Sequence, residues 1–133
     1  MLATTTGCGR FRKAKECGVL ADTVSAWMKK DAPPPSPAGA DTPALVADAR
    51  ATAGRYRELD RTLAGIKLES DELTPLVQRY RQMAVQSAQA LEEVARALSD
   101  ENLEHARKLR VDFDAIVRAE APLVNEINAA CRK

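Results

Sequence analysis

Few residues in this chain are of the types that carry catalysis or bind metals. There are three cysteines, Cys8, Cys17 and Cys131, and one histidine, His105. A structural zinc site needs four thiolate or imidazole ligands. The cysteines lack CxxC spacing, and His105 lies far along the chain from Cys8 and Cys17. A zinc site would have to recruit carboxylates, so we expect neither a metal nor a cofactor.

His105 offers little for enzymatic chemistry. Glu101 precedes it by four residues, which would supply half of a helical metal site. A ferritin-like di-metal bundle, however, needs a Glu-x-x-His motif from each of two helices. A Ser-His-Asp triad could use only His105. Because this histidine falls beside Ala106, outside the apolar stripe of its segment, we expect it to face solvent, and we expect no enzymatic activity.

Two polar residues, Arg110 and Glu120, interrupt the apolar stripe of the last helical segment. If Glu120 is buried, it needs an Arg or Lys partner and would mark a ligand pocket. Arg110 could extend to the edge of the fold. In the alternative that we favour, the stripe drifts, and Ile116 and Leu123 take the core positions.

The composition is that of a folded helical domain. Of 133 residues, 45% are apolar, 29% charged and 4% aromatic. The core must be built mainly from aliphatic residues, and small and straight-chain residues favour helix. The net charge of +1 gives no general attraction to nucleic acid. No apolar run approaches the roughly 20 residues needed to span a bilayer.

Four segments place apolar residues at alternating four- and three-residue steps, the spacing of one helix face. They cover roughly residues 10–30, 43–66, 73–98 and 100–131. Pro122 lies inside the last segment and should kink or restart that helix, because proline removes one backbone hydrogen bond. The sequence therefore predicts four helices, the last of them broken.

Capping residues mark where these helices begin. Thr42 is the expected N-cap of the second helix, and Ser99 or Asp100 that of the fourth. The third begins near Ser70 or Thr74. Along the third helix, the charged side chains are expected to form a solvated face with pairs within the helix.

The short links force each of the last three helices to fold back on the one before. We therefore predict an all-α, antiparallel three- to four-helix bundle with long helices over residues 44–133. The N-terminal helix, residues 10–30, is joined to it by a Pro-rich linker at 31–43, and residues 1–9 form a disordered tail or the remnant of a lipoprotein signal. A coiled coil between chains is the alternative. The predicted core residues are Tyr56, Leu59, Leu63, Tyr80, Leu91, Val94, Phe113, Val117 and Ile127.

The N-terminal sequence reads MLATTTGCG. Thr6, Gly7 and Cys8 resemble the end of a bacterial lipobox, in which a small residue and glycine precede a lipid-modified cysteine. Thr5 departs from the pattern, since leucine is usual there, and the basic and apolar parts of a signal peptide are missing. The resemblance implies a small bacterial lipoprotein of unknown function, anchored at Cys8, if the true start lies upstream. The alternative is an incidental Gly-Cys.

With Cys8 set aside as an anchor, Cys17 and Cys131 remain as a pair. Both fall on apolar stripes, and in an up-down-up-down bundle the start of the first helix and the end of the fourth lie at the same end. We predict a disulfide between them, which requires an oxidising compartment to persist. The alternative is two buried free thiols.

Four basic residues follow Cys8: Arg10, Arg12, Lys13 and Lys15. Beside a lipid anchor this cluster would contact anionic head groups of a membrane surface. Without an anchor it is a solvated helix start. One short basic tract without a base-reading motif does not predict nucleic-acid binding.

The sequence thus predicts a class of protein rather than an activity. We expect a non-catalytic helical interaction or structural module of the bacterial cell envelope, lipid-anchored at Cys8, that binds an unidentified protein or self-associates. The alternative is a cytoplasmic helical or coiled-coil adaptor that self-associates or binds a partner helix.

Overall fold

The computed structural model describes residues 2–30, 37 and 39–133, and their side chains from Gly9 onward. The described residues form five helices and no strand, so the all-α prediction is confirmed. The Pro-rich linker predicted at 31–43 lies largely outside the described residues. The helices are α1 (Leu2–Lys29), α2 (Thr42–Ala64), α3 (Leu73–Ser99), α4 (Leu103–Arg118) and α5 (Glu120–Arg132).

The helices begin at other caps than the sequence suggested. Asp41, not Thr42, caps α2: its backbone is extended and its carboxylate accepts a hydrogen bond from the Ala44 amide at 3.1 Å. Asn102 caps α4 in place of Ser99 or Asp100, and accepts from the His105 amide at 3.2 Å. Several neighbouring residues could accept such a bond, and the turn before each helix decides which one is placed to cap it.

Two helix boundaries are informative. α1 begins at Leu2 rather than at residue 10, so a helix covers most of the segment for which a disordered tail or the remnant of a lipoprotein signal was predicted. Extending an existing helix costs far less than nucleating one, which allows weak helix formers to join it. The break expected from Pro122 is confirmed: α4 ends at Arg118 and α5 restarts at Glu120 with the proline in its first turn.

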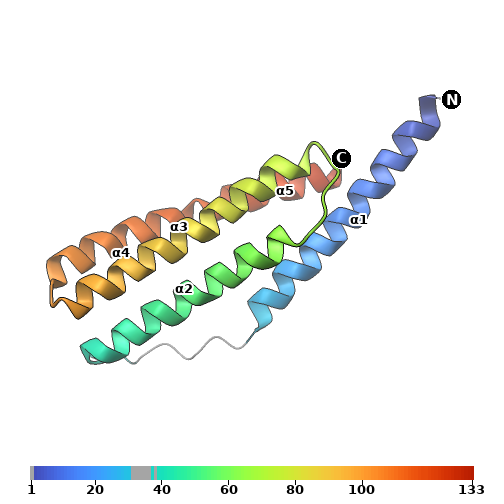
Figure 1. The fold of residues 1–133 in the computed structure, drawn as a ribbon. Coiled ribbons are helices and arrows are strands. Elements are labelled where there is room, and N and C mark those ends of the chain that lie inside the picture. Colours follow the sequence, from blue (N-terminus) through green and yellow to red (C-terminus); the bar gives the residue numbers. More distant parts are fainter. Residues whose placement is uncertain (1, 31–36, 38) are drawn as a thin grey trace.

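α3 is the central helix of a helical bundle (Figure 1). α2 packs along one side of α3, and α4 followed by α5 packs along another. α1 contacts α2 and α5, and its N-terminal part extends beyond the other helices (Figure 1). Seven of the nine predicted core residues are buried, while Tyr56 and Val117 are half-buried against the same clusters.

Three charged residues of α3 form ion pairs with neighbouring helices, and the pKa of Glu92 is lowered by its hydrogen bonds from Arg57 and also by the charge of Arg96, one turn further along α3. Exposed ion pairs of this kind contribute little to stability, about 0.2–1 kcal/mol each. They are consistent with a single orientation of α3 about its own axis. The pairs are Arg57 with Glu92 through two hydrogen bonds of 2.7 and 2.8 Å, Arg81 with Asp60 at 2.8 Å, and Arg79 with Glu126 at 2.9 Å.

Candidate functional site

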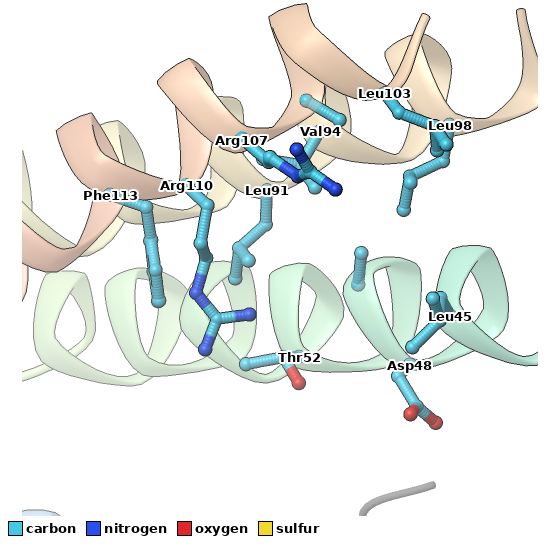
Figure 2. Close-up of a pocket in the computed structure, with 12 residues that line it drawn as sticks. Leu45, Asp48, Thr52, Leu91, Val94, Leu98, Leu103, Arg107, Arg110 and Phe113 are labelled. Carbon is cyan, nitrogen blue, oxygen red and sulfur yellow. The ribbon is translucent and has the colours of Figure 1, made fainter. Parts of the chain in front are cut away.

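An apolar groove of about 520 Å³ runs over α3 between α2 and α4. We call it the α2–α4 groove (Figure 2). Its floor is buried and its rim is exposed: Leu91 and Phe113 are under a tenth exposed, whereas Leu45 is 41% and Leu103 51% exposed. The lining residues are Leu45, Asp48, Ala49 and Thr52 of α2, Leu91, Val94 and Leu98 of α3, and Leu103, Ala106, Arg107, Arg110 and Phe113 of α4.

The groove lies beyond the end of α1. In the α5 half of the bundle, α1 packs against both α2 and α5. Near its last turn, Trp27 bonds to the Arg55 carbonyl, and Lys30 pairs with Glu58. From Arg55 back to Thr42, α2 continues for about 20 Å. Over that length, no helix among the described residues occupies the position between α2 and α4 that α1 holds between α2 and α5.

Aromatic contacts connect α1, α2 and α4 at the α1 end of the groove. The Trp27 and Tyr56 rings are 5.7 Å apart between centroids, and Tyr56 meets Phe113 edge-on at 6.2 Å. Such arrangements contribute about 0.5–1.5 kcal/mol beyond the area they bury. The near end of the groove is therefore closed by three packed rings.

The charged residues that line the groove are two cations and one anion: Arg107, Arg110 and Asp48. Figure 2 shows Arg110 reaching from α4 toward Thr52 of α2. Its guanidinium lies 5.6 Å from the centre of the Phe113 ring and pairs with Asp114 at 3.3 Å. Arg110 is exposed, so the possibility that it is a buried polar residue is wrong; its stem covers Phe113 and its charge stays in water.

Glu120 is half-buried and accepts a hydrogen bond from the Tyr80 hydroxyl at 2.7 Å. The expected partner was Arg or Lys, and a neutral phenol takes that place instead. Burial, and then the bond to Glu120, raises the pKa of Tyr80 above its ordinary value of 10.0. Leu123 is buried and Ile116 packs half-buried against the core, while Glu120 is half-buried as well, so features of both alternatives are present. Because α5 begins at Glu120, the carboxylate of this residue faces α3.

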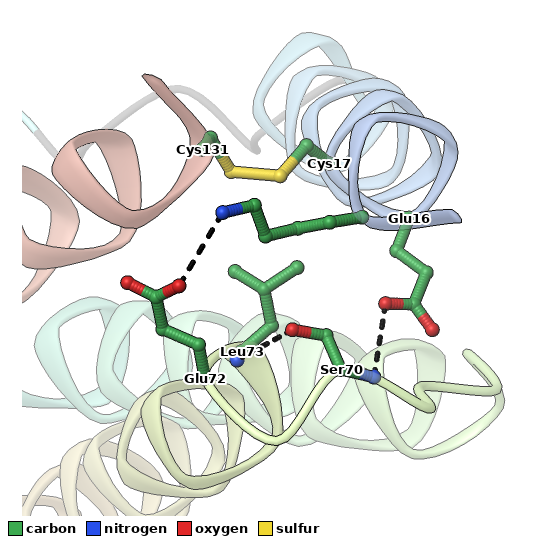
Figure 3. The surroundings of a disulfide bond; sticks show 7 residues. Glu16, Cys17, Ser70, Glu72, Leu73 and Cys131 are labelled. Atoms are coloured by element: carbon green, nitrogen blue, oxygen red, sulfur yellow. Dashed lines mark hydrogen bonds and ion pairs between the residues drawn. A yellow bond between two sulfur atoms is a disulfide. The ribbon is translucent and has the colours of Figure 1, made fainter. Parts of the chain in front are cut away.

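At the other end of the bundle, Cys17 of α1 and Cys131 of α5 form a disulfide with their Cα atoms 6.0 Å apart (Figure 3). The bond joins residues 114 positions apart in sequence. Beside it, a cavity of about 220 Å³ is lined by apolar residues of α1 and α5 and by Tyr80. The predicted pairing of Cys17 with Cys131 is thus present in the structure.

Glu16 is a structural residue that the sequence analysis missed. It is 7% exposed, and its carboxylate accepts hydrogen bonds from the backbone amides of Glu69 and Ser70 in the link before α3 (Figure 3). The Ser70 hydroxyl in turn accepts from the Leu73 amide at 3.2 Å. Glu16 directly precedes Cys17, so one turn of α1 is attached to both the α2–α3 link and α5. A single acidic residue on an apolar face was the only sequence signal.

The basic cluster after Cys8 is divided by the fold. Arg12 pairs with Glu69 at 2.9 Å, and Lys13 pairs with Glu72 at 3.3 Å. Arg10 and Lys15 are exposed. These four residues therefore do not share one open face of α1, and contact between the cluster and a membrane stays a prediction.

The remaining candidate residues are peripheral. His105 is exposed on α4, as expected. The Cys8 side chain lies outside the described part, so its lipid anchor is untested. Within the described residues, His, Cys, Asp and Glu side chains form no group of three suited to a metal ion, and no helix is long and apolar enough to cross a membrane.

Comparisons with family models, with curated proteins and with solved structures give no match for this chain.

Proposed function

We propose that this protein is a non-catalytic helical interaction module that binds a partner helix in the α2–α4 groove. The observation that carries the proposal is the apolar groove between α2 and α4, a position that no helix of the described residues fills. A floor of buried Leu91, Val94 and Phe113, with Leu45 and Leu103 exposed on the rim, is suited to the apolar face of an amphipathic helix.

The proposal includes an antiparallel bundle in which α1 is the fourth member and the Pro-rich residues 31–43 are the linker. α1 supplies Leu20, Val24 and Trp27 to the main core at the spacing of one helix face. Because α1 ends at Lys29, the residues that the structure describes fill the fourth position along only part of the bundle. A partner helix would complete it.

We further propose that the protein works in an oxidising compartment, the bacterial cell envelope, anchored by a lipid on Cys8. Support comes from the Cys17–Cys131 disulfide, since cytosolic thiols are kept reduced. About nine residues of helix, roughly 13 Å, separate Cys8 from Cys17. An anchor there would lie at the opposite end of α1 from the groove. A cytoplasmic adaptor with the same groove is the alternative, and the redox state of the two cysteines in the host distinguishes them.

The helix-binding proposal is tested by titrating the isotope-labelled, oxidised protein with an amphipathic peptide of about 14 residues. Its leucines are spaced alternately four and three apart, and its other positions are glutamine and alanine. Chemical shift changes are expected at Leu45, Ala49, Leu98 and Leu103. Leu45→Asp should weaken binding, whereas Val111→Asp, at an exposed apolar site of α4 outside the groove, should not. No shift changes at the groove with saturating peptide would refute the proposal.

A further inference from the structure

The charges on the α2–α4 groove indicate which kind of helix it takes. We propose that the partner segment is an acidic amphipathic helix of about 13 residues that continues the line of α1. This inference rests on the proposed helix-binding function and adds the length, the position and the charge of the partner.

The length follows from the space beside α2. Trp27 and Arg55 mark where α1 ends against α2, and Thr42 marks where α2 begins. The 13 residues between Thr42 and Arg55 span about 20 Å, which a helix of the same length would cover. A shorter segment would leave Leu45 and Leu103 on the far rim uncovered.

The position follows from continuity with the packing of α1. α1 lies between α2 and α5 and buries Leu20 against α3 and α5 residues such as Tyr80 and Ile127. Beyond its end, the same face of α3 carries Leu91, Val94 and Leu98 at three- and four-residue steps, with Leu91 and Val94 only 3% and 6% exposed on the groove floor. A ridge with this spacing accommodates a second helix in the same manner. An acyl chain would not need this periodicity.

The charge follows from Arg107 and Arg110, which stand one turn apart on the α4 rim. The guanidinium group of an arginine can bind a carboxylate through two parallel hydrogen bonds. Besides its contact with the Phe113 ring, Arg110 has one ion pair, with Asp114 at 3.3 Å, which is exposed and weak enough to exchange. Within residues 9–30 and 39–133, no ion pair or hydrogen bond involves the Arg107 side chain. Two carboxylates three or four residues apart on the partner would match both guanidinium groups.

The test compares three peptides that share one leucine seam and differ in their flanking residues, which are glutamate, glutamine or lysine. With the full-length oxidised protein, the glutamate peptide should bind about fivefold more tightly than the glutamine peptide, and the lysine peptide more weakly than either. In R107E/R110E the order should reverse, and in R107Q/R110Q the preference should vanish. The matched control K108E/R118E makes the same charge change at exposed positions of α4 outside the groove, and should keep the original order.

Equal binding of all three peptides, or the same order in R107E/R110E, would overturn the acidic partner while leaving the helix-binding function intact. If the glutamine peptide does not bind at all, the proposed function itself fails. Two further outcomes would replace the partner: palmitate that produces the same groove shifts and displaces the glutamate peptide, or a dimer in sedimentation velocity that Leu45→Asp dissociates. Each of these measurements uses folded protein, checked by the helical signal in circular dichroism.

Discussion

Trp27 and Arg55 hold α1 against α2 through three separate contacts. The Trp27 indole donates to the Arg55 carbonyl at 2.8 Å, and the Arg55 side chain donates to the Trp27 carbonyl at 3.3 Å. The guanidinium also lies 5.1 Å from the centre of the indole ring. Together with Lys30 and Glu58, this contact marks the point where α1 ends and the α2–α4 groove begins.

Trp27→Phe should lower the free energy of unfolding by about 1 kcal/mol, because the Arg55 carbonyl loses its indole donor while a ring remains. Arg55→Lys removes the planar group over the ring, and the double variant should lose less than the sum of the two single losses, with a coupling of about 0.5–1 kcal/mol. Urea denaturation of the four oxidised proteins measures this. Strictly additive losses would show that the two side chains do not interact.

Leu63→Ala should destabilise the protein by about 2–5 kcal/mol, because Leu63 is fully buried and the substitution leaves a cavity. The matched control is Val111→Ala at a 62% exposed position, where a change within about 0.5 kcal/mol is expected. Thermal or urea unfolding measures both. A loss at Leu63 as small as at Val111 would contradict the main hydrophobic core described above.

Reduction of the Cys17–Cys131 disulfide should lower stability by about 4–5 kcal/mol in the chain-entropy model, because the bond closes a loop of more than 100 residues. Urea denaturation with and without a reductant measures the loss, and C17S/C131S should match the reduced protein. For the compartment, thiols are blocked in the living host before lysis. Mass spectrometry without reduction should then find a peptide joining residues 17 and 131; alkylated Cys17 and Cys131 would instead favour the cytoplasmic adaptor.

Both tyrosines should resist deprotonation in the folded protein. Burial, followed by the nearby Glu120 charge, raises the pKa of Tyr56, and burial and the bond to Glu120 raise that of Tyr80. Since the chain has only these two tyrosines, tyrosinate absorbance near 295 nm should be small at pH 10 in native protein. In guanidinium-unfolded protein it should reach half its maximum there. Equal titration curves in the two states would contradict the buried Tyr80–Glu120 pair.

The same shift predicts the direction of alkaline instability. A group whose folded-state pKa is raised contributes stability that is fully present below its unfolded pKa of 10.0 and is lost as the pH rises above it. The unfolding midpoint of the wild type should therefore fall above pH 10 through Tyr80. Tyr80→Phe lacks that titration, so its midpoint should decline less steeply over the same range. A steeper decline in the variant would contradict this assignment.

Local pattern alone determined the helices and much of the core of this protein. Alternating apolar steps predicted four helical segments, and Pro122 predicted the restart between α4 and α5. Buried Leu59, Leu63 and Leu91 were also predicted, because helix periodicity and side-chain hydrophobicity are properties of neighbouring residues. The Cys17–Cys131 pair followed once Cys8 was set aside as a lipid anchor and an up-down order of the helices was assumed.

Only the tertiary structure decided the contacts that depend on where whole helices lie. In the sequence, Glu16 is a polar residue on an apolar helix face. In the structure it is a buried hydrogen-bond acceptor, because the link between α2 and α3 passes beside α1. Glu120 finds Tyr80, 40 positions away, because the restart of α5 rotates its side chain toward α3. Among the described residues, the α2–α4 groove lies where α2 and α4 continue beyond Lys29, the last residue of α1. A groove of this kind depends on the length of one helix relative to its neighbours and forms only when the helices pack. No local sequence pattern therefore predicts it.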